Sequence, residues 1–414
     1  MSDRIIFHAD CNNFYASCEI LQRPELKDVP MAVAGDPENR VGVVVAKNEL
    51  AKRAGVKTTD TVHQARKKCP GIVFVPPRHQ YYGEISKRVN AIYLEYTDLV
   101  EPASIDESYI DMTKVAPALH MEPRDLADEL RRRVRDEIGI TISVGISFCK
   151  IFAKMGSDYK KPDATTVISR ENYRNILWPL PVGDLYMAGK AAAATMEKHY
   201  IHTIGDLAQQ SQETMHGMLG KHGDLLWRYA NGIDEEPIRR YGDRPEIKSV
   251  SRGRTFKRDL LTESEIKIAI SVLADEVARA LRKSNMKGEV VSVQIRRPDM
   301  VDISRQTGLG HYTFLQLEIQ EVAMELIREN WRIGAPIRAL TVGVSKLVPK
   351  DRVVEQMSLF DFAQPPAGQE KLGSAAREKQ EKLEALVDEL REKHGDGSIT
   401  LGYHENKEIG LERK

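Results

Sequence analysis

The sequence is poor in cysteine and has no long apolar run, and each absence excludes some classes of protein. Its four cysteines, Cys11, Cys18, Cys69 and Cys149, include no C-x-x-C pair, which argues against a zinc site and a disulfide scaffold. No apolar stretch approaches the ~20 residues of a membrane span, and the N-terminus lacks the segments of a secretion signal. We therefore expect a cytoplasmic chain without membrane spans, and 414 residues suggest roughly three domains.

Net charge is also absent, because 61 Lys and Arg balance 61 Asp and Glu. The balance is uneven along the chain: residues 238–350 hold 21 Lys and Arg against 14 Asp and Glu. One basic module in a neutral chain is typical of a protein that binds a polyanion. A solvated charged surface gives the same excess, so charge alone leaves both interpretations open.

Apolar patterning predicts a small α/β sheet near the N-terminus. Residues 4–8 read as a strand that delivers Asp10 at its end, and residues 102–112 and 141–147 as two more strands. Helical composition or spacing is found in three segments, residues 48–55, 78–97 and 124–138. This order favours a sheet with its helices on one face.

The rest of the chain divides into a helical region, a second α/β unit and a tail. Glycines break residues 172–232 into short helices, and residues 233–247 have the composition of a tether. A β-α-β-β-α-β pattern follows, with elements at residues 248–257, 263–283, 289–296, 300–308, 315–331 and 337–347. In the tail, residues 371–394 predict a charged helix, more typical of a solvated helix than of a coiled coil.

Acidic residues stand at two unusual places. Asp10 ends an apolar strand, and Asp106 and Glu107 lie inside a segment that otherwise reads as a half-buried strand. Acids in core strands are costly unless a cation compensates them, and carboxylates are ligands suited to Mg²⁺. The alternative is an edge strand whose acids face water.

Three motifs relate these acids to a known family. Residues 10–19 (DCNNFYASCE), 104–113 (SIDESYIDMT) and 143–162 (SVGISFCKIFAKMGSDYKKP) resemble, in order and spacing, the palm motifs of Y-family translesion DNA polymerases. The resemblance runs from Ile5 to Phe362. It is strongest to the bacterial polymerase IV branch, with some features of the polymerase V branch.

The resemblance implies a multidomain α/β (α+β) fold, that of a right-hand polymerase. The implied parts are a ferredoxin-like palm (1–20 and 78–168), small fingers (21–77), a helical thumb (169–232), a linker (233–247), a β-α-β-β-α-β little finger (248–350) and a tail (351–414). Small fingers and a tethered little finger imply an open site that tolerates lesions at the expense of fidelity.

By the same resemblance, Asp10, Asp106 and Glu107 would bind two Mg²⁺ ions, helped by the backbone carbonyl of Cys11. Asn12 replaces a family acid that is not usually a metal ligand, so activity should survive this departure.

Tyr15 matches the family's steric gate, which excludes a ribose 2′-hydroxyl. For its neighbour Phe14, which completes the family's aromatic pair, we favour packing in the core. Lys161 matches the lysine that contacts the triphosphate, and Lys150 is a weaker candidate of the same kind.

The fingers segment departs from the polymerase IV pattern. Glu49 and Lys52 stand where that branch has a tyrosine and an arginine that hold the triphosphate. Lys52 or Arg53 could supply the charge, whereas an ionised Glu49 only accepts hydrogen bonds.

Residues 186–207 resemble the helix-hairpin-helix of the thumb, in which Gly189 and Lys190 would meet a DNA phosphate. Met187 and Tyr200 stand where the family often has glycine, and a non-glycine residue resists a left-handed backbone. A plain helical thumb is the alternative.

In the little finger, strand residues could meet phosphates without reading sequence. They are Ser251, Arg252, Arg254, Thr255, Arg296 and Arg297.

Residues 356–360 (QMSLF) resemble the peptide that bacterial polymerases insert into the sliding clamp. Leu359 and Phe360 would fill an apolar pocket and Gln356 would bond at its rim. The alternative is that these side chains fold back onto the little finger.

The function implied is a template-directed, Mg²⁺-dependent DNA polymerase of low fidelity. It would be a monomer that extends primers past damaged template bases, with primer-template DNA, deoxynucleoside triphosphates and the sliding clamp as partners. Two rivals are a catalytically inactive scaffold and a nucleotide cyclase. The first should have lost its carboxylates, and the second needs neither a thumb nor a basic accessory domain.

Overall fold

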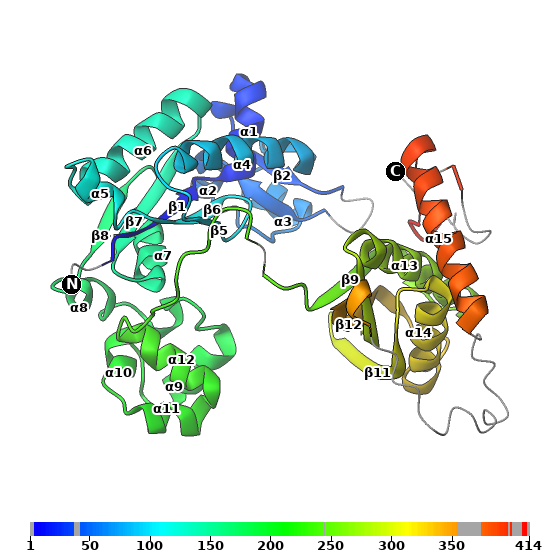
Figure 1. The fold of residues 1–414 in the computed structure, drawn as a ribbon. Helices are drawn as coiled ribbons and strands as arrows, with labels where there is room; N and C mark the ends of the chain where they lie inside the picture. The colour runs from blue at the N-terminus through cyan, green and yellow to red at the C-terminus, as the bar shows by residue number, and fades with distance from the viewer. Residues whose placement is uncertain are drawn as a thin grey trace. The chain divides into compact units, whose positions relative to one another are not determined.

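The computed structural model describes residues 4–36, 42–243, 245–353, 374–395, 398–399 and 408–411. The chain divides into two compact units (Figure 1). The first combines Met1–Gly35 with Gly42–Arg244, and the second combines Asp36–Val41 with Pro245–Lys414. No helix among the described residues is long and apolar enough to cross a membrane.

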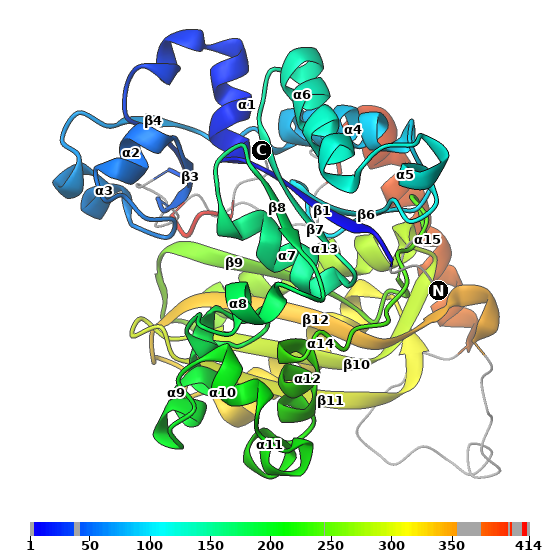
Figure 2. The same ribbon diagram turned by 90° about the vertical axis from the view of Figure 1, so that its left-hand side faces the viewer.

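A five-stranded sheet in the order β5-β6-β1-β7-β8 forms the centre of the first unit. Figure 2 labels four of its strands, β6, β1, β7 and β8. Strand β1 lies in the middle, antiparallel to both β6 and β7, and β7 runs parallel to β8. The strands are β1 (Ile6–Cys11), β5 (Val100–Pro102), β6 (Glu107–Asp111), β7 (Ile142–Ser147) and β8 (Thr165–Ile168).

Helices cover both faces of this sheet, so the expectation of helices on one face is wrong. Helices α4 (His79–Leu94) and α6 (Pro123–Ile138) share a core with Phe7 and Ala9 of β1. Helix α7 (Lys150–Tyr159) packs on the other face, where it meets Ile6 and His8. The reason is burial: every residue of β1 is buried, and a strand buried on both sides needs cover on both.

Gly145 of β7 allows α7 to lie close to the sheet. A Cβ atom there would be 1.9 Å from the backbone oxygen of Ala153, so only glycine fits. Because α7 lies so close to the sheet, its side chains contact residues of β1.

Residues 102–112 hold the end of one strand of a hairpin, its turn and its second strand, not the single strand expected. Strand β5 ends at Pro102 and β6 begins at Glu107. In the turn, Ser104 Oγ accepts hydrogen bonds from the backbone N–H groups of Asp106 (3.3 Å) and Glu107 (3.1 Å). A short polar side chain that bonds to the backbone ahead of it favours a turn over a strand.

A second, three-stranded sheet of the first unit has the order β3-β2-β4. Its strands are β2 (Met31–Ala34), β3 (Val44–Lys47) and β4 (Val73–Val75). Nearby lie α1 (Phe14–Gln22), a 3-10 turn η1 (Pro24–Lys27), α2 (Glu49–Arg53) and α3 (Val62–Lys68). The expected helix at 48–55 is thus confirmed over α2, whose N-cap Asn48 accepts from Ala51 N–H at 3.0 Å.

Short helices follow, as expected, and share one apolar core. They are α8 (Tyr173–Leu177), η3 (Val182–Asp184), α9 (Lys190–Lys198), α10 (Ile204–Ala208), α11 (Gln212–Leu219) and α12 (Lys221–Ala230). A further short helix, α5 (Val115–Ala118), comes earlier in the chain.

Part of the segment predicted as a tether lies against the first unit. Ile238 is buried in a cluster with Ile6 and Tyr109. Arg239 forms an ion pair of 2.7 Å with the buried Glu101. These contacts hold the chain against the first unit as far as Arg239.

The second unit has the predicted β-α-β-β-α-β order. Its elements are β9 (Ser249–Leu260), α13 (Glu263–Lys283), β10 (Met286–Arg296), β11 (Asp302–Thr313), α14 (Gln316–Asn330) and β12 (Ile337–Pro349). The sheet order is β11-β10-β12-β9, and both helices share the core on one face. A 3-10 turn, η4 (Lys350–Arg352), follows the last strand.

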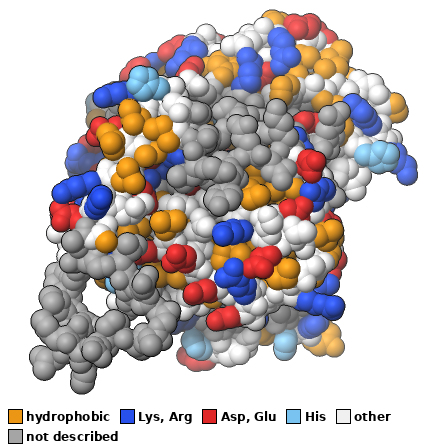
Figure 3. Space-filling view, turned by 90° about the vertical axis from the view of Figure 1, so that its right-hand side faces the viewer, with side chains coloured by type: hydrophobic (Ala, Val, Ile, Leu, Met, Phe, Trp, Pro, Cys, Tyr) orange, Lys and Arg blue, Asp and Glu red, His pale blue; other side chains and the backbone are white. Residues whose placement is uncertain are grey.

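Helix α15 (Ser374–His394) confirms the charged helix expected in the tail, but it is attached by its charged side. Arg391, only 1% exposed, pairs with Asp275 of α13 at 3.0 Å, and Asp388 pairs with Arg282 at 2.6 Å. Leu383 and Leu386 are each 52% exposed. Figure 3 views the molecule from the side on which α15 lies in Figure 1, and shows Lys and Arg interspersed with Asp and Glu.

Candidate active site

A cavity of about 370 Å³ in the first unit collects most of the residues that the three motifs predict. Its lining comes from the end of β1, the start of α1, the β5–β6 turn with the first residue of β6, strand β3, the segment after α2 and the segment after α7. The residues are Asp10, Cys11, Asn13, Phe14, Tyr15, Val45, Ala46, Lys47, Thr58, Ile105, Asp106, Glu107 and Lys161.

Strand pairing brings the three acids together. Asp10 lies directly opposite Glu107 in the β1–β6 register, and Asp106 is the last residue of the turn before β6. The N–H of Cys11 donates to the backbone oxygen of Asp106 at 3.0 Å. Because β6 starts at Glu107, the two consecutive acids are not forced to opposite faces as they would be inside a regular strand.

The donor set is chemically suited to divalent cations, since three carboxylates face one polar cavity. Cations of the protein already lie against two of them. Lys154 Nζ is 2.6 Å from Glu107 Oε1 and 3.3 Å from Asp10 Oδ2, and Lys161 Nζ is 2.6 Å from Asp10 Oδ2. In this side-chain arrangement, no group of three or more acidic, His or Cys side chains within the described ranges is placed to hold a metal ion.

Burial shapes the protonation of this cluster. Desolvation and a hydrogen bond with Asp10 raise the pKa of Glu107, while Lys154 opposes the shift. The adjacent His8 is fully buried, with Nδ1 2.8 Å from Ser157 Oγ. Burial, Lys154 and Lys161 lower its pKa well below the usual value, so His8 is neutral near pH 7.

The two aromatic residues of the first motif have different environments. Phe14 is buried in the core shared by α4 and α6. Tyr15 is half-buried and lines the cavity, and burial raises its pKa. The Tyr15 ring stacks on Tyr82 of α4, with centroids 4.3 Å apart and 17° between the planes.

Tyr82 belongs to a buried network that the sequence did not reveal. Its hydroxyl donates to Glu19 Oε1 at 2.7 Å, and Arg78 donates to both carboxylate oxygens of Glu19, at 2.8 and 2.7 Å. Burial alone would raise the pKa of Glu19, but the bonds from Arg78, Tyr82 and Arg23 lower it overall. Glu19 closes the first motif, DCNNFYASCE, and that is the only signal the sequence offered.

Three lysines of the third motif take different positions. Lys161 lines the cavity. Lys150 does not, because it is buried in an ion pair of 2.8 Å with Glu101. Lys154, which the sequence analysis did not single out, contacts the acids.

The fingers residues Lys52 and Arg53 are not among the described residues that line the cavity, whereas Lys47 and Thr58 are. Lys52 instead pairs with Glu49 at 3.4 Å, and Glu49 also accepts from Asn13 at 2.9 Å. Burial and the nearby Lys52 lower the pKa of Lys47.

The segment that resembles a DNA-binding hairpin has a left-handed backbone at the two positions where the family often has glycine. Met187 and Tyr200 adopt positive φ values of 73° and 63°. Gly189 is the N-cap of α9, and Lys190 is its first residue. Tyr200 is 85% exposed, so little packing of its ring offsets the strained backbone.

The arginines predicted to meet DNA do not share one face of the second sheet. Arg254 and Arg252 lie opposite Leu340 and Val342, whose side chains are in the core, so these arginines belong to the helix-covered side of β9. Arg254 pairs there with Glu276 of α13 at 2.5 Å.

The other face of the second sheet, opposite α13 and α14, has mostly uncharged polar side chains. Thr255 pairs with Ala339 in register, and Ala339 with Arg296. Arg296 forms two 2.7 Å bonds with Asp302.

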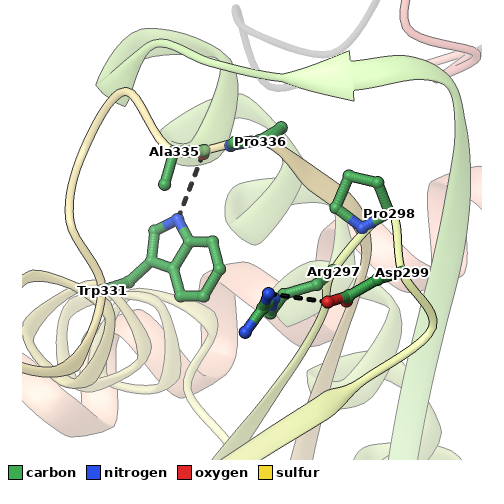
Figure 4. Close-up of a pocket in the computed structure, with 6 residues that line it drawn as sticks. All are labelled: Arg297, Pro298, Asp299, Trp331, Ala335 and Pro336. Atoms are coloured by element: carbon green, nitrogen blue, oxygen red, sulfur yellow. Dashed lines mark hydrogen bonds and ion pairs between the residues drawn. The ribbon is translucent and has the colours of Figure 1, made fainter.

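Arg297 lies beyond the end of β10, beside a separate cavity of about 470 Å³ (Figure 4). Its guanidinium pairs with Asp299 at 2.6 Å. Trp331 lines the same cavity and donates from its indole nitrogen to the backbone oxygen of Ala335 at 3.3 Å (Figure 4).

Gln356, Leu359 and Phe360 lie outside the described residues.

Comparison with known families identifies the family to which this chain belongs. Residues 9–158 match the impB/mucB/samB family, and residues 247–359 match the C-terminal domain of the same family. The chain therefore belongs to this family, the Y-family DNA polymerases, and its enzyme class is that of a DNA-directed DNA polymerase.

Relatives extend the similarity over nearly the whole chain. A DNA polymerase IV of Acetivibrio thermocellus is 40% identical over 96% of this chain and 97% of its own length. DNA polymerase IV 1 of Bacillus subtilis is 35% identical over 98% of this chain and 94% of its own. A Y-family DNA polymerase chimera of Dbh and Dpo4 has the same fold, with a TM-score of 0.72 at 21% identity over 83% of this chain and 99% of its own.

Proposed function

We propose that this chain is a template-directed, low-fidelity DNA polymerase that extends primers past damaged template bases with the help of two Mg²⁺ ions. The observation that carries the proposal is the register of β1 and β6. It sets Asp10 beside Glu107, next to Asp106, at a cavity that Tyr15 and Lys161 also line.

In this proposal, Asp10, Asp106, Glu107 and the backbone carbonyl of Cys11 bind the metal. Divalent metal held by these groups would supply positive charge that favours ionisation of the primer 3′-hydroxyl and neutralises the triphosphate. The remaining roles fall to the protein itself. Lys161, beside Asp10, meets the triphosphate, and the Tyr15 ring rejects a 2′-hydroxyl.

The proposal keeps the domain boundaries of the sequence analysis. The five-stranded sheet is the palm, the three-stranded sheet the fingers, the helices of 169–232 the thumb and the second unit the little finger. Lys47 replaces Lys52 and Arg53 as the fingers cation nearest to the triphosphate, since it lines the cavity. Gly189 and Lys190, at the start of α9, meet a phosphate. Sequence-independent contacts come from different sides of the second sheet: Arg252 and Arg254 on the helix-covered side of β9, Arg296 on the opposite face and Arg297 beyond the end of β10.

Primer extension on an undamaged template and on one with a single abasic site tests this function. We expect the unmodified chain to extend both, and Asp106→Asn to lose roughly 10³-fold in rate, several kcal/mol of transition-state stabilisation. DNA binding by fluorescence anisotropy should persist in Asp106→Asn. Asp111→Asn, at the other end of β6, is the matched control. If the unmodified chain binds DNA but never extends it, the inactive scaffold is the better description.

The proposal also includes a tether to the sliding clamp through Gln356, Leu359 and Phe360, and it rests on their sequence pattern. Phe360→Ala is expected to abolish stimulation of primer extension by the clamp, while extension without the clamp persists. Equal stimulation of both proteins would assign this segment another role.

A further inference from the structure

Two lysines and an aspartate outside the three motif acids complete a ring of alternating charges. Lys154 Nζ lies 2.6 Å from Glu107, 3.3 Å from Asp10 and 3.3 Å from Asp158. Lys161 Nζ lies 2.6 Å from Asp10 and 2.7 Å from Asp158. Both ammonium groups therefore share the same two carboxylates, Asp10 and Asp158.

Lys154 holds the position of a cation between the two facing acids. Its side chain is 11% exposed, and it projects from α7 toward the paired residues of β1 and β6. Three buried or half-buried carboxylates without a compensating charge would repel one another. When no metal ion is bound, an ammonium group between Asp10 and Glu107 removes most of that repulsion.

The same ammonium competes with a metal ion for the same oxygens. A divalent cation on Asp10 and Glu107 would lie only a few ångströms from Lys154 Nζ, a distance at which like charges repel strongly in a buried site. Lys154 must therefore release Asp10 and Glu107 when they bind metal. Among the ion pairs of the described residues, its remaining carboxylate is Asp158, which is 51% exposed and on the same helix.

We propose that Lys154 is a resident counter-cation of the catalytic carboxylates, and that Asp158 receives it, and steadies Lys161, when divalent cations take Asp10 and Glu107. The inference rests on the proposed function and concerns two positioning residues. It predicts opposite effects of the two residues on metal affinity, because one competes with the metal and the other draws the competitor away.

Metal binding without DNA or nucleotide tests the exchange. Mn²⁺ is titrated into the full chain and followed by electron paramagnetic resonance. Lys154→Met is expected to bind Mn²⁺ about tenfold more tightly, and Asp158→Asn about tenfold more weakly, the size typical of groups that support metal ligands. In the Lys154→Met background, Asp158→Asn should have a smaller effect, because one of its two lysines is gone.

Thermal melting supplies a second readout. Lys154→Met should melt at a lower temperature than the unmodified chain without metal and regain most of the difference with Mn²⁺, since the metal then neutralises the acids. Lys160→Met is the control, because the adjacent Lys160 is exposed and makes no ion pair within the described ranges. It should change neither affinity nor melting.

Weaker Mn²⁺ binding in Lys154→Met, or shifts of the same sign in both variants, would overturn the exchange. An Asp106→Asn chain that binds Mn²⁺ as the unmodified chain does would remove the metal site on which it depends. Primer extension by the same preparations reports the proposed function independently, so the two failures are distinguishable.

Discussion

The ring of Tyr15 lies almost flat on the ring of Tyr82, with 4.3 Å between centroids. Tyr82 is fully buried, and its hydroxyl is bonded to Glu19, a carboxylate that Arg78 also holds. The residue proposed to discriminate the sugar is therefore supported from behind by a fixed aromatic side chain. To exclude a 2′-hydroxyl group, the Tyr15 ring must keep its position when a nucleotide binds.

Sugar selectivity should depend on both rings. We expect Tyr15→Ala to raise the ribonucleotide-to-deoxyribonucleotide ratio of kcat/KM by roughly 10–100-fold, the range for a misfit of a few atoms in a pocket. Tyr82→Leu should raise it less, because the Tyr15 ring remains but loses its backing. Single-nucleotide insertion measures the ratio. Tyr81→Leu is the matched control, and sugar selectivity unchanged in Tyr15→Ala would remove the gate assignment.

The Glu19 network should make stability depend on pH in the acid range. The folded protein lowers the pKa of Glu19, so this carboxylate stabilises the fold above its unfolded pKa. That contribution is lost as the pH falls through the lowered pKa of the folded state. Glu19→Gln should cost about 1.5–3 kcal/mol at neutral pH.

The difference between the Glu19→Gln variant and the unmodified chain should shrink below about pH 4.5, near the ordinary pKa of a glutamate. Calorimetric melting between pH 3 and 7 measures it. A difference that stays constant over this range would show that the charge of Glu19 does not contribute.

Lys150 should matter for stability and not for nucleotide binding. Its ammonium and the Glu101 carboxylate are 5% and 8% exposed, and removal of Lys150 leaves Glu101 with Arg239 as its remaining cationic partner. Lys150→Met should cost about 1.5–3 kcal/mol of stability, because the hydrogen bond from Lys150 to the buried Glu101 carboxylate is lost. The KM for deoxynucleotides should not change, since Lys150 does not line the cavity. A raised KM at unchanged melting temperature would contradict this.

Tyr200→Gly should stabilise the protein. The residue holds φ at 63° with 85% of its surface exposed, so glycine relieves backbone strain and sacrifices little packing. We expect a gain of about 1 kcal/mol, seen as a higher melting temperature. Tyr200→Ala keeps the Cβ atom and should give no such gain. An equal gain in both variants would trace the effect to the phenol ring instead.

The three acids that line the candidate site and the order of the second unit were predictable from the sequence. Asp10, Asp106 and Glu107 were identified by type and motif, and the β-α-β-β-α-β order by the period of apolar residues, which depends only on near neighbours in the chain. The turn within residues 102–112 was missed because it depends on local hydrogen bonds from the backbone N–H groups of Asp106 and Glu107 to Ser104. These bonds do not disturb the alternation of apolar residues.

Contacts between distant segments depended on the tertiary structure alone. Lys150 and Lys154 lie one helical turn apart on α7 and read alike in the sequence, yet one is buried against Glu101 and the other contacts Asp10 and Glu107. The register of β1 with β6 and the glycine-permitted approach of α7 decide between them, because a shift of one residue would turn every side chain of the strand to the other face. The amino-acid sequence specifies which chemical groups are present, and the packing of helix on sheet specifies which of them come into contact.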